Sequence, residues 1–207
     1  MSQYFHIHPD NPQPRLLKQA VGIIRSGGVI AYPTDSAYAL GCHLGDKDAL
    51  QRIIRLRQLD ERHHFTLMCR DLSEIATYAK VDNATYRLLK AHTPGAYTFI
   101  LTASSEVPKR LMHPKRKTIG LRVPEHAICQ GLLAELNEPM LTTTLQLPGA
   151  EEPLYDPEEI HESLGKQLDL VINGGFGAML STTVVDLSAE DGVQILRIGA
   201  GDPAPFR

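Results

Sequence analysis

The sequence predicts a single α/β domain built on a twisted, open, mixed sheet. Predicted helices and strands alternate along all 207 residues, without a long linker, a repeat or a low-complexity segment, and this alternation is typical of one α/β core. A chain of this length can bury one sizeable core. We therefore expect one domain over residues 1–207, with residues 1–12 and 199–207 as loosely packed ends.

Six segments carry helical signals. In residues 15–26 apolar side chains recur at helical spacing, and Gly27-Gly28 supply a stop. Asp46 is placed to cap a second helix, whose apolar face includes Leu50 and Ile53. The other predicted helices cover residues 71–79, 82–92, 126–136 and 157–164.

The strand signals are short runs rich in Thr, Ile, Val and aromatic residues, bounded by turn residues. These runs cover residues 29–32, 65–69, 96–103, 118–123, 140–144, 168–172, 182–187 and 193–198. The last three follow one another closely, which predicts that part of the sheet is antiparallel.

The composition is that of an ordinary soluble globular protein, with 43% hydrophobic and 22% charged residues. No apolar run approaches the roughly 20 residues that a membrane helix needs, and the first residues lack the features of a secretory signal. The three cysteines, Cys42, Cys69 and Cys129, are widely spaced. We therefore expect reduced, buried thiols in a cytoplasmic protein with no membrane partner.

Charge is distributed unevenly along the chain. Residues 1–122 carry 18 Lys or Arg against 10 Asp or Glu, whereas residues 123–207 carry 3 against 14. A basic surface on a protein of net charge −3 points to a polyanionic ligand. Nucleotide phosphates and RNA both meet this description.

The common motifs for phosphate binding and hydrolysis are missing. The sequence has no G-x-x-x-x-G-K-[ST], no G-x-G-x-x-G after a strand, no G-x-S-x-G and no H-E-x-x-H. His6 and His8 are too weak a pair to predict a metal site. His63-His64 is interpreted as a surface pair.

Two basic groups remain as candidates. Arg55 and Arg57 would diverge by about 200° within a helix, but they would converge if the helix has just ended. Instead of binding a ligand, the arginines of the first group could simply be solvated at the end of a helix, and the residues of the second group could lie in a solvated loop. The first group is Arg52, Arg55, Arg57 and Arg62, with His63-His64 beside them, and the second is Lys109, Arg110, Lys115, Arg116 and Lys117.

Arg122 and several hydroxyl groups are candidates of a different kind. Arg122 lies inside an apolar strand, where it needs an anionic partner that an internal carboxylate or a ligand could supply equally well. Hydroxyl residues collect at strand ends in residues 142–144, which are all threonines, and 181–183, which are Ser-Thr-Thr. Threonine is a good strand former, but hydroxyls at strand ends would also suit an amino-acid head group and phosphate oxygens.

Taken in order, the motifs resemble the YrdC/YciO family, the threonylcarbamoyl-AMP synthase superfamily, and most closely its YciO branch. The similarity covers nearly the whole chain. It rests on G-G-V-I-A-Y-P-T-D-S-A-Y-A-L-G at 27–41, R-L-R at 55–57, P-G-A-Y-T-F-I-L at 94–101, T-I-G-L-R-V-P at 118–124, N-G-G at 173–175, T-T-V-V-D at 182–186 and I-L-R-I-G at 195–199.

The resemblance implies an open, twisted α/β sheet with a basic concave face. It also implies an ATP-binding nucleotidyltransferase that joins L-threonine, bicarbonate and ATP into threonylcarbamoyl-adenylate and pyrophosphate, for the t⁶A modification of tRNA. Mg²⁺ would accompany ATP, and no tightly bound protein metal site is expected. By resemblance, Thr34, Arg122 and Thr182 would hold threonine. Arg55 and Arg57 would be the catalytic pair at the triphosphate. The other nucleotide contacts would be Thr118, Thr144, Gln146 and Arg197.

The resemblance leaves alternatives open. The family's K-x-R is replaced by Arg55-Leu56-Arg57, and its S-x-N by Thr144-Leu145-Gln146. Adenylation of another amine, a slow version of the same reaction and no catalysis at all are each compatible with these changes. The non-catalytic alternative is a protein that binds double-stranded RNA or tRNA on the same concave face. Its phosphate contacts would be Arg52, Arg62, Lys109, Arg110, Lys115, Arg116 and Lys117.

Overall fold

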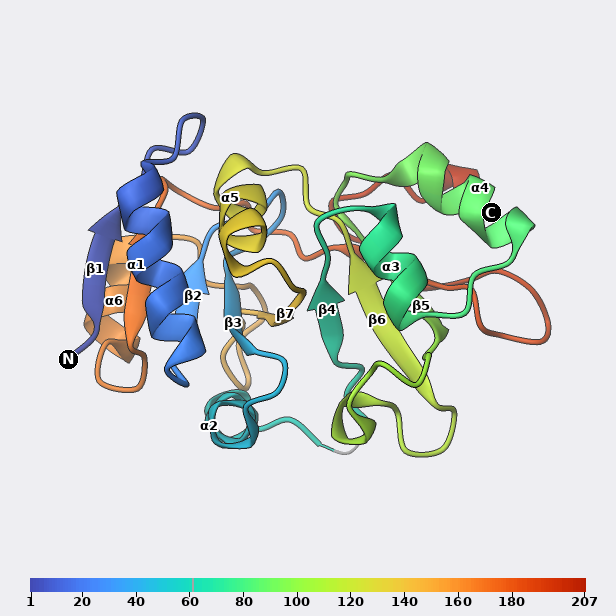
Figure 1. Ribbon diagram of the computed structural model, residues 1–207, viewed down its shortest axis with the longest axis horizontal. Helices are drawn as coiled ribbons and strands as arrows, with labels where there is room; N and C mark the ends of the chain where they lie inside the picture. Colours follow the sequence, from blue (N-terminus) through green and yellow to red (C-terminus); the bar gives the residue numbers. More distant parts are fainter. Residues whose placement is uncertain (61) are drawn as a thin grey trace.

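One ten-stranded mixed sheet organises the chain in the computed structural model, which describes residues 1–60 and 62–207 (Figure 1). The strand order is β1-β8-β2-β3-β7-β4-β6-β5-β9-β10. The pairs β1–β8, β2–β8, β4–β6 and β5–β9 are parallel, and the others are antiparallel. The prediction of a partly antiparallel sheet is therefore confirmed. The strands are β1 (Gln3–His6), β2 (Ile30–Tyr32), β3 (Ala39–His43), β4 (Thr66–Met68), β5 (Tyr97–Thr102), β6 (Thr118–Arg122), β7 (Met140–Thr144), β8 (Leu170–Asn173), β9 (Thr183–Asp186) and β10 (Gln194–Arg197).

The six predicted helices are all present, and aspartates define where four of them begin. The Asp46 carboxylate accepts a hydrogen bond from the Ala49 amide, which confirms the predicted cap. Asp71, Asp82 and Asp156 cap three further helices in the same way. The helices are α1 (Pro14–Arg25), α2 (Lys47–Arg57), α3 (Leu72–Tyr78), α4 (Asn83–His92), α5 (Ala127–Leu136) and α6 (Pro157–Leu164), with 3₁₀ helices η1 (Lys109–Leu111) and η2 (Ala204–Phe206).

Strand β3 was not predicted, because its sequence lacks the β-branched and aromatic residues of the other strands. Its conformation comes from pairing with β2 on one side and β7 on the other. The close fit requires a glycine at position 41, where a Cβ atom would lie 2.8 Å from the Tyr32 ring. Tertiary contacts therefore decide this strand.

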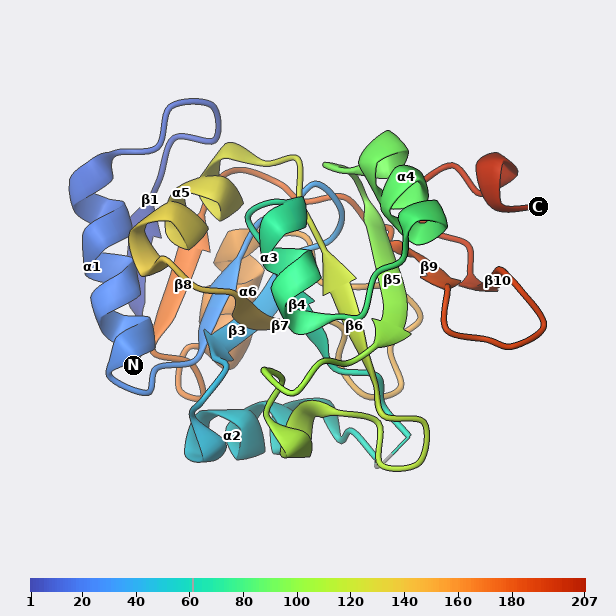
Figure 2. The same cartoon turned by 45° about the vertical axis from the view of Figure 1, so that its right-hand side comes forward.

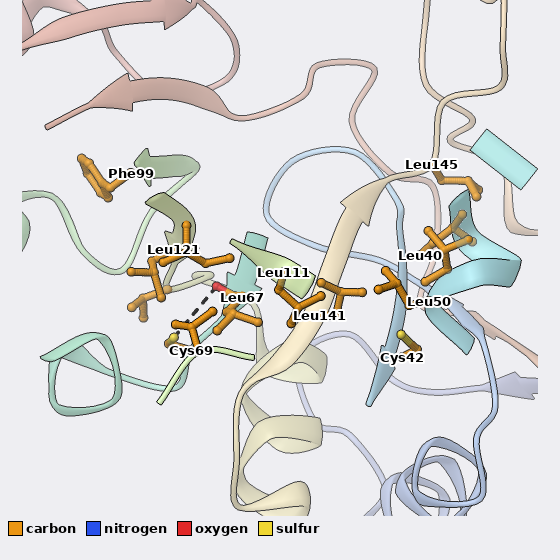
Figure 3. Close-up of a cluster of buried hydrophobic side chains, with 14 of the residues drawn as sticks. Leu40, Cys42, Leu50, Leu67, Cys69, Phe99, Leu111, Leu121, Leu141 and Leu145 are labelled. Atoms are coloured by element: carbon orange, nitrogen blue, oxygen red, sulfur yellow. Dashed lines mark hydrogen bonds between the residues drawn. The ribbon is translucent and has the colours of Figure 1, made fainter. Parts of the chain in front are cut away.

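The core consists of two apolar clusters formed by alternate residues of the strands. One lies between the sheet and helices α1 and α5, and includes Ile30, Tyr32, Met68 and Met140. The other joins opposite strand residues to α2, α3, α4 and α6. Figure 3 shows part of it, with Leu67 of β4 and Leu141 of β7 beside Leu111, and Leu40 of β3 next to Leu50 of α2. The three cysteines are buried and free, as predicted.

Each end of the chain is anchored to the domain at particular residues, although residues 8–11 and much of 199–207 are exposed, as expected for loosely packed ends. Strand β1 extends the sheet by parallel pairing with β8, and Ile7 is buried just beyond it. At the other end, the Phe206 ring is 6% exposed and lies 4.7 Å from His92 and 5.5 Å from Tyr97, between ring centroids. Both ends add apolar surface to the core, which outweighs the entropy of leaving them free.

The packing of Phe206 predicts an effect on stability. We expect Phe206→Ala to lower the free energy of unfolding by about 3 kcal/mol, because the change removes a buried ring and leaves a cavity. Urea unfolding measures this effect, with Arg207→Ala as a control at the exposed neighbouring position. Equal stability of the two variants would contradict a packed C-terminal end.

Candidate functional site

One half of a sheet face, on strands β4, β6, β5 and β9, carries polar residues, whereas the other half carries the apolar cluster under α1 and α5. Figure 2 shows the course of these strands and the positions of α1 and α5. These polar residues line a pocket of about 280 Å³, near the lower end of small-molecule sites. We call it the arginine pocket. Its charged and titratable residues are Arg57, Arg62, Arg122, Arg197, His63 and His64, and its threonines are Thr66, Thr98, Thr142, Thr143, Thr144 and Thr182.

The floor of the arginine pocket depends on a glycine between two threonine strands. Gly120 lies opposite Thr66 and Ile100 in the ladder of β4, β6 and β5. A Cβ atom at this position would lie 2.6 Å from the Thr66 hydroxyl oxygen. The glycine of the T-I-G-L-R sequence therefore leaves the centre of the pocket floor without a side chain. Two residues later, the Arg122 side chain projects from the same face of the sheet.

Arg122 is buried, with 5% of its surface exposed, and it already has one anionic partner. Its Nη2 donates to the Asp35 carboxylate and lies 3.5 Å from the Ser36 hydroxyl. Asp35 also accepts a hydrogen bond from the Glu125 amide. The buried Nε of Arg122, however, has no hydrogen-bond partner among the described residues. An internal carboxylate thus fixes Arg122, and one donor stays available for a ligand anion.

Arg57 and Arg197 are held by neutral oxygens. Arg57 donates from Nε to the Gln146 carbonyl (2.6 Å) and from Nη1 to the Thr143 hydroxyl (2.7 Å). Arg197 donates from Nε to the Thr182 carbonyl (3.0 Å) and from Nη2 to the Thr182 hydroxyl (3.1 Å). Within residues 1–60 and 62–207, neither guanidinium has a carboxylate within salt-bridge distance.

The electrostatics of these arginines favour a bound anion. Burial lowers the pKa of Arg57, and the positive charge of Arg197 lowers it further. The pKa of Arg197 is lowered in the same way, by burial and by Arg122. Each guanidinium therefore raises the cost of charging the next. An anion placed among them would remove that repulsion and would make strong charge-assisted hydrogen bonds.

The structure separates Arg55 from Arg57, although the resemblance implies that both face the triphosphate. Helix α2 continues to Arg57, so the two side chains diverge as residues two apart in a helix must. Arg55 is exposed and borders a separate depression with Lys166 and Gln167. Arg57 alone of the pair lines the arginine pocket.

The remaining predicted ligand residues divide into two groups. Thr144, Gln146 and Thr182 line the arginine pocket, and Thr182 also shares a 2.7 Å hydrogen bond with Thr98. Thr34 and Thr118 are buried and do not line it. The Thr34 hydroxyl is used within its own turn, where it donates to the Ala37 carbonyl and accepts from the Ser36 amide.

His63 and His64 line the arginine pocket, although the sequence interpretation treated them as a surface pair. Gln58 ends helix α2 in a left-handed conformation, and the chain then reaches β4 at Thr66. The sequence gives no signal for the direction of this connection. The adjacency of two histidines to a basic helix end was the only available hint.

Some of the residues predicted to contact RNA already have hydrogen-bond partners within the protein, and others are exposed. Arg52 donates to Asp169 (2.7 Å) and Arg116 to Asp186 (2.7 Å), while Arg110 donates to the Gly45 carbonyl (2.6 Å). Lys109, Lys115 and Lys117 are exposed on residues 109–117, which we call the basic loop. Arg62 is exposed at the arginine pocket.

The described part of the chain contains no group of three or more His, Cys, Asp or Glu residues that could hold a metal ion. None of its helices is both long and apolar enough to cross a membrane.

Comparison with known proteins identifies the family. Residues 22–199 match the Sua5/YciO/YrdC family model, which is described as "Telomere recombination". The chain therefore belongs to the Sua5/YciO/YrdC family, as the sequence motifs predicted. It is 59% identical to YciO of Escherichia coli over the full length of both chains. The crystal structure of E. coli YciO superposes on all of this chain with a TM-score of 0.97.

More distant relatives are enzymes by name. The human threonylcarbamoyl-AMP synthase is 33% identical over 88% of this chain and 67% of its own length. The crystal structure of P. abyssi Sua5 complexed with L-threonine covers 96% of this chain and 58% of its own, with a TM-score of 0.87 at 22% identity. This likeness confirms the predicted single-domain α/β fold.

Proposed function

We propose that the protein catalyses the ATP-dependent adenylation of an amino-acid carbamate, with L-threonine as the first candidate amine. The observation that carries the proposal is the arginine pocket, in which Arg57 and Arg197 lack carboxylate partners among the described residues. The 33% identity to the human threonylcarbamoyl-AMP synthase supports the same reaction class.

The proposed reaction needs positioning and charge neutralisation more than covalent help. The amine nitrogen of threonine bonds to the carbon of bicarbonate, water leaves, and a carbamate results. A carbamate oxygen then bonds to the α-phosphorus of ATP, and the bond from that phosphorus to the bridging oxygen breaks, so that pyrophosphate leaves. Magnesium enters as part of the MgATP substrate. Placing the two anionic reactants in line supplies most of the rate enhancement for such a transfer.

The residues of the arginine pocket suit two parts of this reaction. The free Nε of Arg122 would receive the carboxylate of the amino acid, beside the Thr182 and Thr98 hydroxyls. Arg57 and Arg197 would receive phosphate oxygens and stabilise the charge that develops on the leaving pyrophosphate. Thr144 and Gln146 border the same space, and the Gln146 amide is tied to the following loop by the Ala150 carbonyl at 2.8 Å.

Direct detection of product tests the proposal. Purified protein is incubated with MgATP, bicarbonate and L-threonine, and threonylcarbamoyl-adenylate is detected by mass spectrometry. We expect product only when all three reactants are present. A parallel series with other amino acids identifies the amine. Protein that binds ATP but makes no carbamoyl-adenylate from any amine would contradict the proposal.

A second candidate is the binding of double-stranded RNA or tRNA without catalysis. It is favoured by the basic loop, where Lys109, Lys115 and Lys117 are exposed. Stacking of His113 on His64, at 5.2 Å between ring centroids, holds this loop against the wall of the arginine pocket. Phosphate contacts from such a loop would give salt-dependent affinity without sequence readout.

Mutation of the basic loop tests RNA binding. For a 16-base-pair RNA duplex, we expect the double change Lys115→Ala and Lys117→Ala to weaken binding and to reduce the salt slope by roughly one per lost phosphate contact. Lys18→Ala, on the exposed side of α1, is the matched control. Binding assays at several salt concentrations give both quantities. The same slope in all three proteins would exclude the basic loop as the RNA contact.

A further inference from the structure

His63 and His64 bring two titratable rings to the wall of a pocket that already holds four arginines. The His63 ring packs edge-on against Phe65, with centroids 5.2 Å apart and planes at 76°. The His64 ring stacks on His113 at 25°. These contacts fix both rings at the pocket, and the buried His64 Nδ1 has no hydrogen-bond partner among the described residues.

The charges around His63 come mostly from arginines. It faces Arg57 of α2 and Arg197 of β10, with Asp60 as the opposing carboxylate and His64 beside it. Burial, Arg57 and His64 lower the pKa of His63 to about 4, although Asp60 raises it. These surroundings therefore keep the ring neutral above pH 5.

The charged groups around His64 are also mostly positive. It faces His113 and Arg116 of the basic loop and Asp186 of β9, and that carboxylate is already paired with Arg116. Burial and the positive neighbours lower the pKa of His64, and Asp186 opposes them only in part. Burial favours the neutral form of both rings, and the positive charge of the pocket adds to this effect.

We propose that His63 and His64 are additional anion ligands of the arginine pocket, and that they take up protons when a phosphate chain binds there. A pyrophosphate or triphosphate group carries several negative charges, which would offset those of Arg57 and Arg197. The neutral imidazoles then become favourable to protonate. A protonated ring donates from both nitrogens, and so it adds hydrogen bonds to phosphate oxygens.

The proposal fixes the direction of a pH dependence. A histidine whose pKa rises on binding strengthens affinity below its pKa in the complex, and the gain levels off below its pKa in the free protein. Between those two limits, affinity rises by up to tenfold per pH unit for each proton taken up. Because the free-protein limit of His63 is about 4, the ratio of phosphate-chain affinity between the unsubstituted protein and a variant without both histidines should still be rising as the pH falls to 5.5.

Calorimetry of inorganic pyrophosphate binding tests the proposal. Titrations at pH 6.5 in two buffers of different ionisation enthalpy give the number of protons exchanged. The double variant His63→Gln and His64→Gln serves as the reference, because pyrophosphate itself exchanges protons equally with both proteins. We expect the unsubstituted protein to take up at least half a proton more than the double variant. His8→Gln, in the exposed N-terminal loop, should match the unsubstituted protein.

A second measurement needs no variant. Histidine ring resonances, followed by NMR over pH 5–8, should show two pKa values that rise when pyrophosphate is added. Equal proton uptake by the two proteins, unchanged histidine titrations, or no pyrophosphate binding would each overturn the inference. This inference depends on the proposed function only in taking MgATP as the natural ligand. Proton uptake without carbamoyl-adenylate synthesis would refute that function alone, and synthesis without proton uptake would refute this inference alone.

Discussion

Replacing Arg122 by Ala should abolish carbamoyl-adenylate synthesis and lower the free energy of unfolding by about 3–5 kcal/mol. The stability loss follows because Asp35, with its side chain 10% exposed, would keep a buried charge without its partner. The activity loss follows because the unpartnered Nε is the donor proposed for the amino-acid carboxylate. Urea unfolding and mass spectrometry of the product measure the two effects.

A second variant separates stability from ligand binding at this position. Arg122→Lys keeps a positive charge beside Asp35 but cannot present two donors in a planar fork. We expect it to fold with a smaller loss of stability and to raise the KM for the amino acid at least tenfold. Normal amino-acid affinity in a folded Arg122→Lys protein would show that Asp35 is the only anion that Arg122 serves.

Replacing Arg57 by Met should weaken pyrophosphate binding by about 10- to 100-fold, the effect of losing one hydrogen bond between charged groups. The expected change in unfolding free energy is small, within about 1 kcal/mol, because Arg57 also repels Arg197 in the empty pocket. Arg197→Met should behave in the same way, since this guanidinium is held by neutral oxygens too. Calorimetry and urea unfolding provide the two readouts.

Arg55→Met is the matched control for the Arg57 variant. It lies two residues earlier on the same helix and borders a different depression, so it should leave pyrophosphate affinity within twofold of the unsubstituted protein. An equal loss at both positions would favour the interpretation based on the R-L-R motif over the geometry of helix α2. Unchanged affinity at both positions would remove α2 from the binding site.

Local sequence signals predicted the helices and most strands, because the interactions that define them are local. Asp46 caps its helix through the amide of Ala49, three residues away, and any chain with this spacing can form the same bond. Strand β7 begins and ends at the predicted residues Met140 and Thr144. The motifs also placed the chain in its family.

The site was predicted less completely, because its members are brought together by contacts between distant segments. Arg122 of β6, Arg197 of β10 and Thr182, just before β9, were predicted by motif, and all line the arginine pocket. His63 and His64 were missed, since the connection that positions them has no periodicity. Thr34 and Thr118 were also predicted by motif, but the motif does not indicate that both side chains are buried.

The sequence by itself determined the α/β class, the helix starts and the residue types that an anion site needs, because each depends on neighbours within a few positions. Only the tertiary structure decided which of those residues meet. Helix α2 turns Arg55 away from Arg57. Pairing with β2 and β7 makes a strand of Ala39–His43, and packing against His92 and Tyr97 anchors Phe206. These outcomes depend on surfaces that exist only after the sheet has formed.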